Sequence, residues 1–242
     1  MEIPKKLRYL TGKALGDFSM IREGDRLLLG LSGGKDSLSL LHILLHFKRH
    51  APIHFELAAI TVDPQSEDFD PSSLIPYLKS INIKYFYIKE PILEMADSHM
   101  EGDSYCSFCS RIKRGVMYST ARENDYNVLV LGQHLDDLAE SFMMSAFHGG
   151  KLKTMKAHYT NDEGDLRVIR PLVYVRERML AKFAKKNELP VIAENCPACF
   201  SKPTQREHMK QLLAGEEEGN SCLFGSLLTT MKPLMAKGLP KS

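Results

Sequence analysis

A short glycine-containing segment carries the residues best suited to bind an anion. It reads Ser32, Gly33, Gly34, Lys35, Asp36, Ser37 and directly follows an apolar run. Two glycines let the backbone approach an anion closely, and a helix that begins there offers unpaired N–H groups and the positive end of its dipole. The lysine and the serine hydroxyls add donors. The segment predicts a phosphate-binding loop, although for the motif alone an ordinary Gly-Gly turn with a solvated lysine is the alternative.

Two cysteine pairs form the second group of reactive side chains, Cys106 with Cys109 and Cys196 with Cys199. Cations follow the first pair, and cations beside a helix start lower the pKa of a thiol and favour the thiolate. The 86 residues between the pairs exceed the roughly 15–20 of a zinc ribbon, so the pairs would have to meet through the fold. Four thiolates could close a zinc site, three could hold a four-iron cluster with one iron open, and a dithiol could carry sulfur as a persulfide.

Acidic residues follow two apolar runs at points where ligands collect in open α/β sheets. Gly132, Gln133, His134, Leu135, Asp136 and Asp137 come after the run 128–131, and Asp63 ends an earlier run. Asp136 and Asp137 fall in the first turn of an expected helix, where carboxylates either hold magnesium through ATP phosphates or simply complement the helix dipole. Asp63 contacts the nucleotide in one interpretation and forms an Asp-Pro turn in the other.

The elements that must position these groups alternate between strands and helices. Apolar runs predict strands, and 3.6-residue periodicity predicts helices. Expected strands cover 26–31, 53–62, 84–88, 128–131 and 167–172, and expected helices cover 5–21, 36–50, 71–81, the stretch up to 123, 135–147 and 176–188, whereas 151–160 is expected to be irregular. This order predicts an α/β fold: a doubly wound, mostly parallel sheet of about five strands with helices on both faces. We expect an N-terminal helical segment (1–24), a nucleotide-binding domain with the cysteine site (25–200) and a C-terminal helical tail (201–242).

Charge and hydropathy narrow the range of partners. The chain has 242 residues and a net charge of only +2, so attraction to nucleic acid must come from local basic clusters or from a homodimer that gathers them. Lys151, Lys153, Lys156, Arg167 and Arg170 are candidates for a surface that follows phosphates, with a solvated loop as the alternative. No apolar run reaches the roughly 18 residues of a membrane span, and the N-terminus lacks a signal-peptide core, so we expect a cytoplasmic protein without a membrane partner.

The combined motifs resemble those of the PP-loop ATPases. Within that superfamily they are similar in kind and order to the TtcA-type tRNA 2-thiocytidine synthetases. The resemblance is carried by SGGKDS (32–37), CSFCSRIKRG (106–115), GQHLDD (132–137), GGK (149–151), IRPL (169–172) and the last cysteine pair, which precedes Arg206. It implies that ATP is cleaved between its α and β phosphates to adenylate a tRNA cytosine, which then receives sulfur.

The resemblance also implies roles for particular residues. Cys106, Cys109 and Cys196 would hold a [4Fe-4S] cluster and leave Cys199 for catalysis. We also assign Lys35, Asp36 and Lys113 to catalysis, with Lys35 stabilising the phosphate charge and Lys113 neutralising the incoming sulfur anion. ATP and Mg²⁺ would contact the 32–37 loop and the set Asp63, Gly132, His134, Asp136 and Asp137. Expected partners are tRNA, ATP and a cysteine-desulfurase-type or sulfide donor. The alternatives are a cluster-free sulfurtransferase that passes a persulfide through Cys106 and Cys199, and a zinc-stabilised RNA-binding module that merely binds nucleotide.

Overall fold

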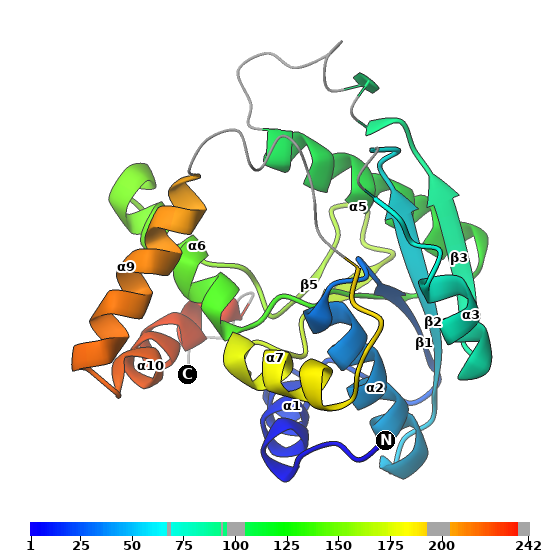
Figure 1. Cartoon of the computed structure of the whole chain (residues 1–242), viewed down its shortest axis with the longest axis horizontal. Coiled ribbons are helices and arrows are strands. Elements are labelled where there is room, and N and C mark those ends of the chain that lie inside the picture. The colour runs from blue at the N-terminus through cyan, green and yellow to red at the C-terminus, as the bar shows by residue number, and fades with distance from the viewer. Residues whose placement is uncertain (67–68, 93, 96–104, 193–203, 237–242) are drawn as a thin grey trace.

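A computed structural model describes residues 1–66, 69–92, 94–95, 105–192 and 204–236, with the side chains of 105–107 outside that description (Figure 1). The helices are α1 (Lys5–Asp17), α2 (Lys35–His50), α3 (Leu74–Ser80), α5 (Tyr105–Glu123), α6 (Leu135–Gly149), α7 (Glu177–Lys186), α9 (Gln205–Gly219) and α10 (Leu223–Met235). The strands are β1 (Asp25–Gly30), β2 (Phe55–Asp63), β3 (Lys84–Lys89), β4 (Val128–Val130), β5 (His158–Thr160) and β6 (Arg167–Ile169). No helix in these ranges is both long and apolar enough to cross a lipid bilayer.

The strands form one twisted sheet in the order β3-β2-β1-β4-β6-β5. All neighbouring pairs are parallel except β5 with β6, which is antiparallel. The predicted fold class is therefore confirmed, but the sheet has six strands where about five were expected. The additional strand, β5, lies in the segment that was expected to be irregular. It forms because the Asn161 side chain closes a turn onto Asp165 and Leu166, which brings His158–Thr160 alongside β6.

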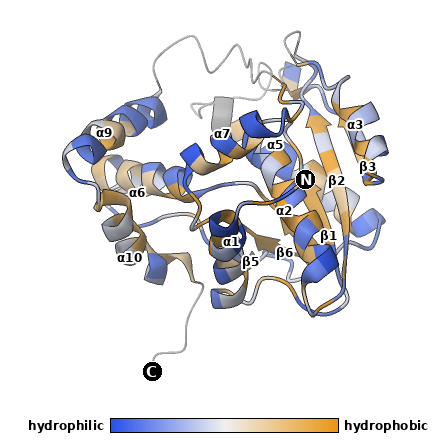
Figure 2. Cartoon of the chain, turned by 60° about the horizontal axis from the view of Figure 1, so that its bottom comes forward, coloured by the Kyte–Doolittle hydropathy of each residue, from blue (hydrophilic) through white to orange (hydrophobic). Residues whose placement is uncertain are grey.

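Helices cover both faces of the sheet, and the alternation of side chains along β1 shows why. Leu27 and Leu29 point into the larger core, which also contains apolar side chains of α1, α2, α3 and α7. Leu28 points to the opposite face, where it packs with residues of α5 such as Ala121. Strands that are buried on both faces are continuous apolar runs, and Figure 2 shows β1 and β2 as hydrophobic ribbons among amphipathic helices.

The centre of the sheet contains a topological switch point. From β1 the chain passes through α2 to β2 on one side, and it later returns through α5 to β4 on the other side. The loops that follow β1 and β4 therefore leave from the same edge of the sheet and from neighbouring strands. In open α/β sheets this is the crevice in which ligands bind.

The two ends of the chain pack onto the same core as the sheet. Leu7 of α1 and Met231 of α10 are both fully buried in the larger core. Asp17, at the end of α1, accepts hydrogen bonds from Tyr174 at 2.9 Å and from Lys232 of α10 at 2.8 Å. The first and last helices are thus fixed to the rest of the fold by both apolar and polar contacts.

Candidate nucleotide site and cysteine pairs

The loop after β1 folds as a cradle that the start of α2 completes. Gly34 N donates to Ser32 Oγ at 3.2 Å, and Ser37 Oγ donates to the Gly34 carbonyl at 3.1 Å, so both serines lie against the turn. Gly34 is the N-cap of α2 and no side chain caps the helix. The first N–H groups of α2 are thereby left for an anion, as expected of a phosphate-binding loop.

Gly33 occupies a position that only glycine can fill. Its φ of +86° lies in the left-handed region, and a Cβ built on it would lie 2.3 Å from Ile192 Cγ1. Ile192 belongs to the segment that returns from α7 toward the start of α2, and its N–H donates to the Gly33 carbonyl at 3.1 Å. The phosphate-binding loop therefore packs against a segment about 160 residues farther along the chain.

The loop after β4 crosses directly over the start of α2. A Cβ on Gly132 would be 3.5 Å from the Ser37 backbone N, so the two predicted nucleotide motifs touch. His134 and Asp137 form a capping box for α6, in which His134 N donates to Asp137 Oδ2 at 2.8 Å and Asp137 N donates to His134 Nδ1. Burial of the ring opposes protonation, but the carboxylates of Asp36, Asp137 and Asp136 outweigh it and raise the pKa of His134.

Asp36 presents an oxygen atom suited to a cation. Its Oδ2 lies 3.3 Å from Lys35 Nζ and 3.7 Å from His134 Nε2. Its Oδ1 is buried and has no hydrogen-bond partner among the described residues. An unpaired buried carboxylate oxygen is costly, and Mg²⁺ bound to nucleotide phosphates prefers such a ligand. The residues present therefore fit ATP with magnesium at this loop.

Asp136 and Asp137 lie at the same edge but take part in ion pairs. Asp136 accepts from Arg176 Nε at 3.0 Å and from the Glu177 N–H at 2.7 Å, so it caps α7 from outside that helix. Asp137 accepts from Arg206 of α9. Asp63, at the end of β2, accepts from Gln65 N at 2.7 Å, which is the turn of the alternative interpretation, and it also accepts from the Tyr87 hydroxyl. Binding of magnesium or nucleotide by these three residues stays a prediction.

The first cysteine pair lies at the start of α5. Cys106 and Cys109 are both in the first turns of the helix, and Lys113 follows Cys109 by one turn. Cys109 is partly buried and packs against the smaller core beside Phe108 and Ile112. The second pair, Cys196 and Cys199, lies outside the described residues, so convergence of the two pairs stays a prediction.

Comparison with known proteins identifies the family. A model of the PP-loop domain matches residues 5–201. The tRNA-cytidine(32) 2-sulfurtransferase of Geobacter sulfurreducens is 40% identical over 228 residues, which cover 94% of this chain and 89% of that protein. The enzyme of the same name from Psychromonas ingrahamii is 42% identical over 214 residues, covering 88% and 69%. This chain belongs to the same family.

Solved structures show the same fold. The U34-tRNA thiolase NcsA from Methanococcus maripaludis, solved with its [4Fe-4S] cluster, superposes with a TM-score of 0.77 at 22% identity, covering 98% of this chain and 80% of that one. The NH₃-dependent NAD synthetase of Campylobacter jejuni superposes with a TM-score of 0.52 at 17% identity, covering 100% and 99%. At these sequence identities the structural similarity establishes the fold alone, and the reaction has to be inferred from the residues of the site.

A chain of ion pairs that the sequence motifs do not predict joins the loop to α9. Lys35 Nζ lies 2.8 Å from Glu177 Oε1, and Lys210 Nζ lies 3.0 Å from Glu177 Oε2. Burial disfavours the charged forms of Glu177 and Lys35. The ion pairs outweigh it, because Lys35 and Lys210 lower the pKa of Glu177 to about 2, and Glu177 and Asp36 raise the pKa of Lys35. Glu177 also lines a cavity of about 260 Å³ between α6, α7 and α9. The available signal was the position of Glu177 as the first residue of the helix after Ile169–Leu172.

We expect Glu177→Gln to lower the free energy of unfolding by about 2 kcal/mol at pH 7, because one amide cannot balance two ammonium groups. The ordinary pKa of 4.5 falls to about 2 in the folded chain, so this stabilisation is complete above pH 4.5 and is lost as the pH falls toward 2. Urea unfolding at several pH values measures it. The variant should lose less stability than wild type between pH 4.5 and 2. Glu216→Gln, an exposed site on α9, is the control and should match wild type.

Three of the five candidates for a phosphate-following surface, Arg167, Arg170 and Lys156, make contacts within the chain instead. Arg167 pairs with buried Asp25 and donates to the Met20 carbonyl, and Arg170 is 7% exposed and donates to Gln133 and to the Lys156 carbonyl. Lys156 donates to two carbonyls at the end of α10. These three side chains donate hydrogen bonds to backbone carbonyls and to the Asp25 carboxylate, which are buried acceptors and require donors. They thereby connect the edge of the sheet to the segments near both ends of the chain. Lys151 and Lys153 remain exposed.

Proposed function

We propose that this chain is an ATP- and iron–sulfur-dependent tRNA sulfurtransferase that converts a cytidine of tRNA to 2-thiocytidine. The observation that carries the proposal is the cradle formed by Ser32–Ser37 and the uncapped start of α2, in a chain 40% identical to named tRNA-cytidine(32) 2-sulfurtransferases. The cradle supplies the nucleotide chemistry, and membership of the family supplies the substrate class. A tRNA loop suits this chemistry, because C2 of a base is reached only on an unstacked nucleotide.

In the first step the cytosine C2 oxygen attacks the α-phosphate of ATP, the bond to the β-phosphate breaks, and pyrophosphate leaves. The N–H groups of α2, Ser32, Ser37 and Lys35 would hold the phosphates and stabilise the charge that develops on them. Asp36 Oδ1 would ligate the magnesium ion. His134 fixes the second loop against the first and so orients the nucleotide.

In the second step sulfide attacks C2 of the adenylated base, the C2–O bond breaks, and AMP leaves. Cys106, Cys109 and Cys196 would hold a [4Fe-4S] cluster, which when bound supplies an iron with an open coordination position for sulfur. Lys113 lies one turn after Cys109 and would neutralise the incoming anion. Cys199 would remain for sulfur handling. The sulfide comes from a desulfurase-type donor or from free sulfide, and a homodimer would enlarge the tRNA-binding surface.

The test is reconstitution under anaerobic conditions. Purified chain, ATP, magnesium, sulfide and an unmodified tRNA transcript should yield 2-thiocytidine by nucleoside mass analysis, one pyrophosphate for each thiolated nucleoside, and a brown protein with broad visible absorbance. Thiolation with a persulfide donor by iron-free protein would favour the cluster-free alternative. A colourless protein with one zinc per chain and no pyrophosphate release would favour the binding module. Either result would contradict the proposal.

A further inference from the structure

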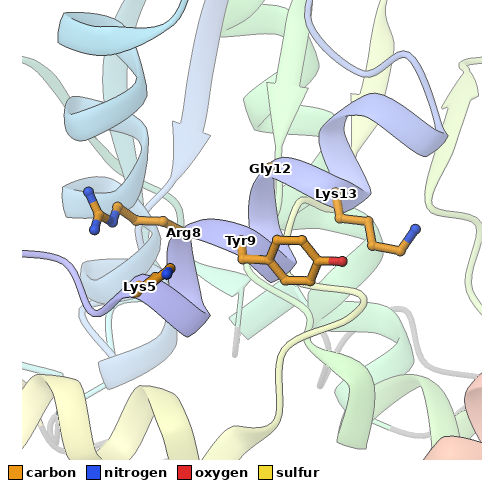
Figure 3. Close-up of a pocket in the computed structure, with 5 residues that line it drawn as sticks. All are labelled: Lys5, Arg8, Tyr9, Gly12 and Lys13. Carbon is orange, nitrogen blue, oxygen red and sulfur yellow. The ribbon is translucent and has the colours of Figure 1, made fainter.

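The outward face of α1 concentrates positive charge. Lys5, Arg8, Tyr9, Gly12 and Lys13 follow one another at helical spacing and line a shallow hollow (Figure 3). The opposite face of the helix, with Leu7, Thr11 and Ala14, is buried in the core. Tyr9 is 65% exposed, although its ring is large and partly apolar. We define the α1 basic face as Lys5, Arg8, Tyr9 and Lys13.

Two features of α1 run against helix stability. Its first turn contains Lys5 and Lys6 and no acidic residue, although the positive end of the helix dipole favours acids there. Gly12 lies inside the helix, where glycine is less favourable than alanine, and a Cβ at this position would meet Phe47 at an ordinary 3.4 Å. Packing requires neither choice, and a first turn that carries lysines without an acidic residue leaves the positive charge of this helix end unbalanced.

The positive region continues onto the end of α2. The last turn of α2 contains Lys48, Arg49 and His50, all exposed, and α2 packs against α1. Burial lowers the pKa of His46, and the nearby charges of Arg8 and Arg49 contribute to that shift. Within the α1 basic face, Lys13 pairs with Asp17 at 3.3 Å. Lys5 and Arg8 are therefore the cations to test.

We propose that the α1 basic face docks the phosphate backbone of the substrate tRNA, away from the nucleotide that is modified; this inference rests on the proposed function. The lysine ammonium, the arginine guanidinium and the tyrosine hydroxyl are typical hydrogen-bond donors to phosphate oxygens. Because the net charge of the chain is only +2, local clusters of this kind are the main source of attraction to RNA. A membrane surface fits less well, because the apolar face of α1 is already buried.

The position of this face suits a long polyanion. α2 begins at the phosphate cradle and has 16 residues, which span about 24 Å at 1.5 Å per residue. Gly12 and Arg8 lie beside Phe47 and His46, near the far end of α2. The basic face is thus about 20 Å from the cradle, a distance short enough for one tRNA molecule to contact both.

The test compares two doubly substituted chains that lose the same charge. Lys5→Glu with Arg8→Glu alters the proposed face. Lys79→Glu with Lys84→Glu alters exposed lysines of α3 and of the start of β3, the edge strand of the sheet. The Kd for tRNA is measured by fluorescence anisotropy at several salt concentrations. We expect the first variant to bind at least about tenfold more weakly at 0.1 M salt and its log–log salt slope to decrease by about 2, while the control stays within about twofold.

Equal weakening in both variants, or wild-type binding by the first, would overturn the proposal. So would unchanged tRNA binding together with slower sulfur transfer from a donor protein, which would identify a protein-binding face. If the reversal disturbs the melting temperature, Lys5→Gln with Arg8→Gln should still decrease the salt slope. The binding assay does not depend on thiolation, so the two proposals can fail separately. If the wild type binds tRNA through this face but forms no 2-thiocytidine, only the proposed function is refuted. If the wild type forms 2-thiocytidine and the Lys5→Glu, Arg8→Glu variant binds tRNA normally, only this inference is refuted.

Discussion

Replacing Gly33 with alanine is expected to reduce ATP-dependent pyrophosphate release at least about 100-fold, the size of effect that a 1 Å displacement of a reacting group produces. The new Cβ would lie 2.3 Å from Ile192 Cγ1 at a φ of +86°, so the loop has to move. Any movement changes the positions of the Gly34 N–H and of Ser32, which the cradle uses. Single-turnover pyrophosphate release at saturating ATP measures the loss.

A matched glycine separates loop displacement from backbone strain. Gly164 has a similar φ of +81°, but a Cβ there meets no atom within 4 Å, and the residue lies in the turn between β5 and β6. Gly164→Ala should lower the free energy of unfolding by about 1 kcal/mol and leave pyrophosphate release unchanged. Wild-type release by Gly33→Ala, or the same loss in both variants, would show that the cradle geometry is not what positions ATP.

The buried parts of the fold are strongly encoded in local sequence. Strands such as β1 and β4 lie between covered faces, so they appear as uninterrupted apolar runs, and each is followed by a loop at the carboxyl edge. That pattern was enough to place the 32–37 and 132–137 motifs together, and Gly132 does lie against Ser37. β5 was missed because its three half-buried residues show no periodicity and depend on pairing with β6.

The charged contacts of the site are encoded at long range and were not predictable. Lys35 pairs with Glu177, and Arg206 with Asp137, across 142 and 69 positions. A single charged residue on an amphipathic helix looks the same whether it faces solvent or a partner. Arg170 was expected to be exposed because it lies in a basic stretch, but it is buried and donates to a backbone carbonyl. No local sequence pattern indicates such burial.

The three-thiolate arrangement predicts unequal effects at the two cysteines of the second pair. Cys196→Ala is expected to lose at least about nine-tenths of the iron retained by anaerobically purified protein, since removing a direct ligand should cost at least as much as the 10–100-fold of outer-shell changes. Cys199→Ala should retain the iron. Neither variant should form 2-thiocytidine. Cys196→Ala lacks the cluster, and Cys199→Ala lacks the thiol that we propose handles sulfur. Iron and acid-labile sulfide content with visible absorbance measure retention.

Cys222→Ala provides the matched thiol control, because Cys222 is exposed at the start of α10, on a helix separate from the one that carries the first pair. It should retain both iron and activity, and Cys109→Ala should behave like Cys196→Ala. Equal loss of iron from Cys196→Ala and Cys199→Ala would mean that four thiolates share the metal. One zinc per chain in the wild type would identify a structural site. The sulfur that reaches C2 would then have to come from a persulfide, whose outer sulfur attacks C2 and is freed when a second thiol forms a disulfide with the carrier cysteine.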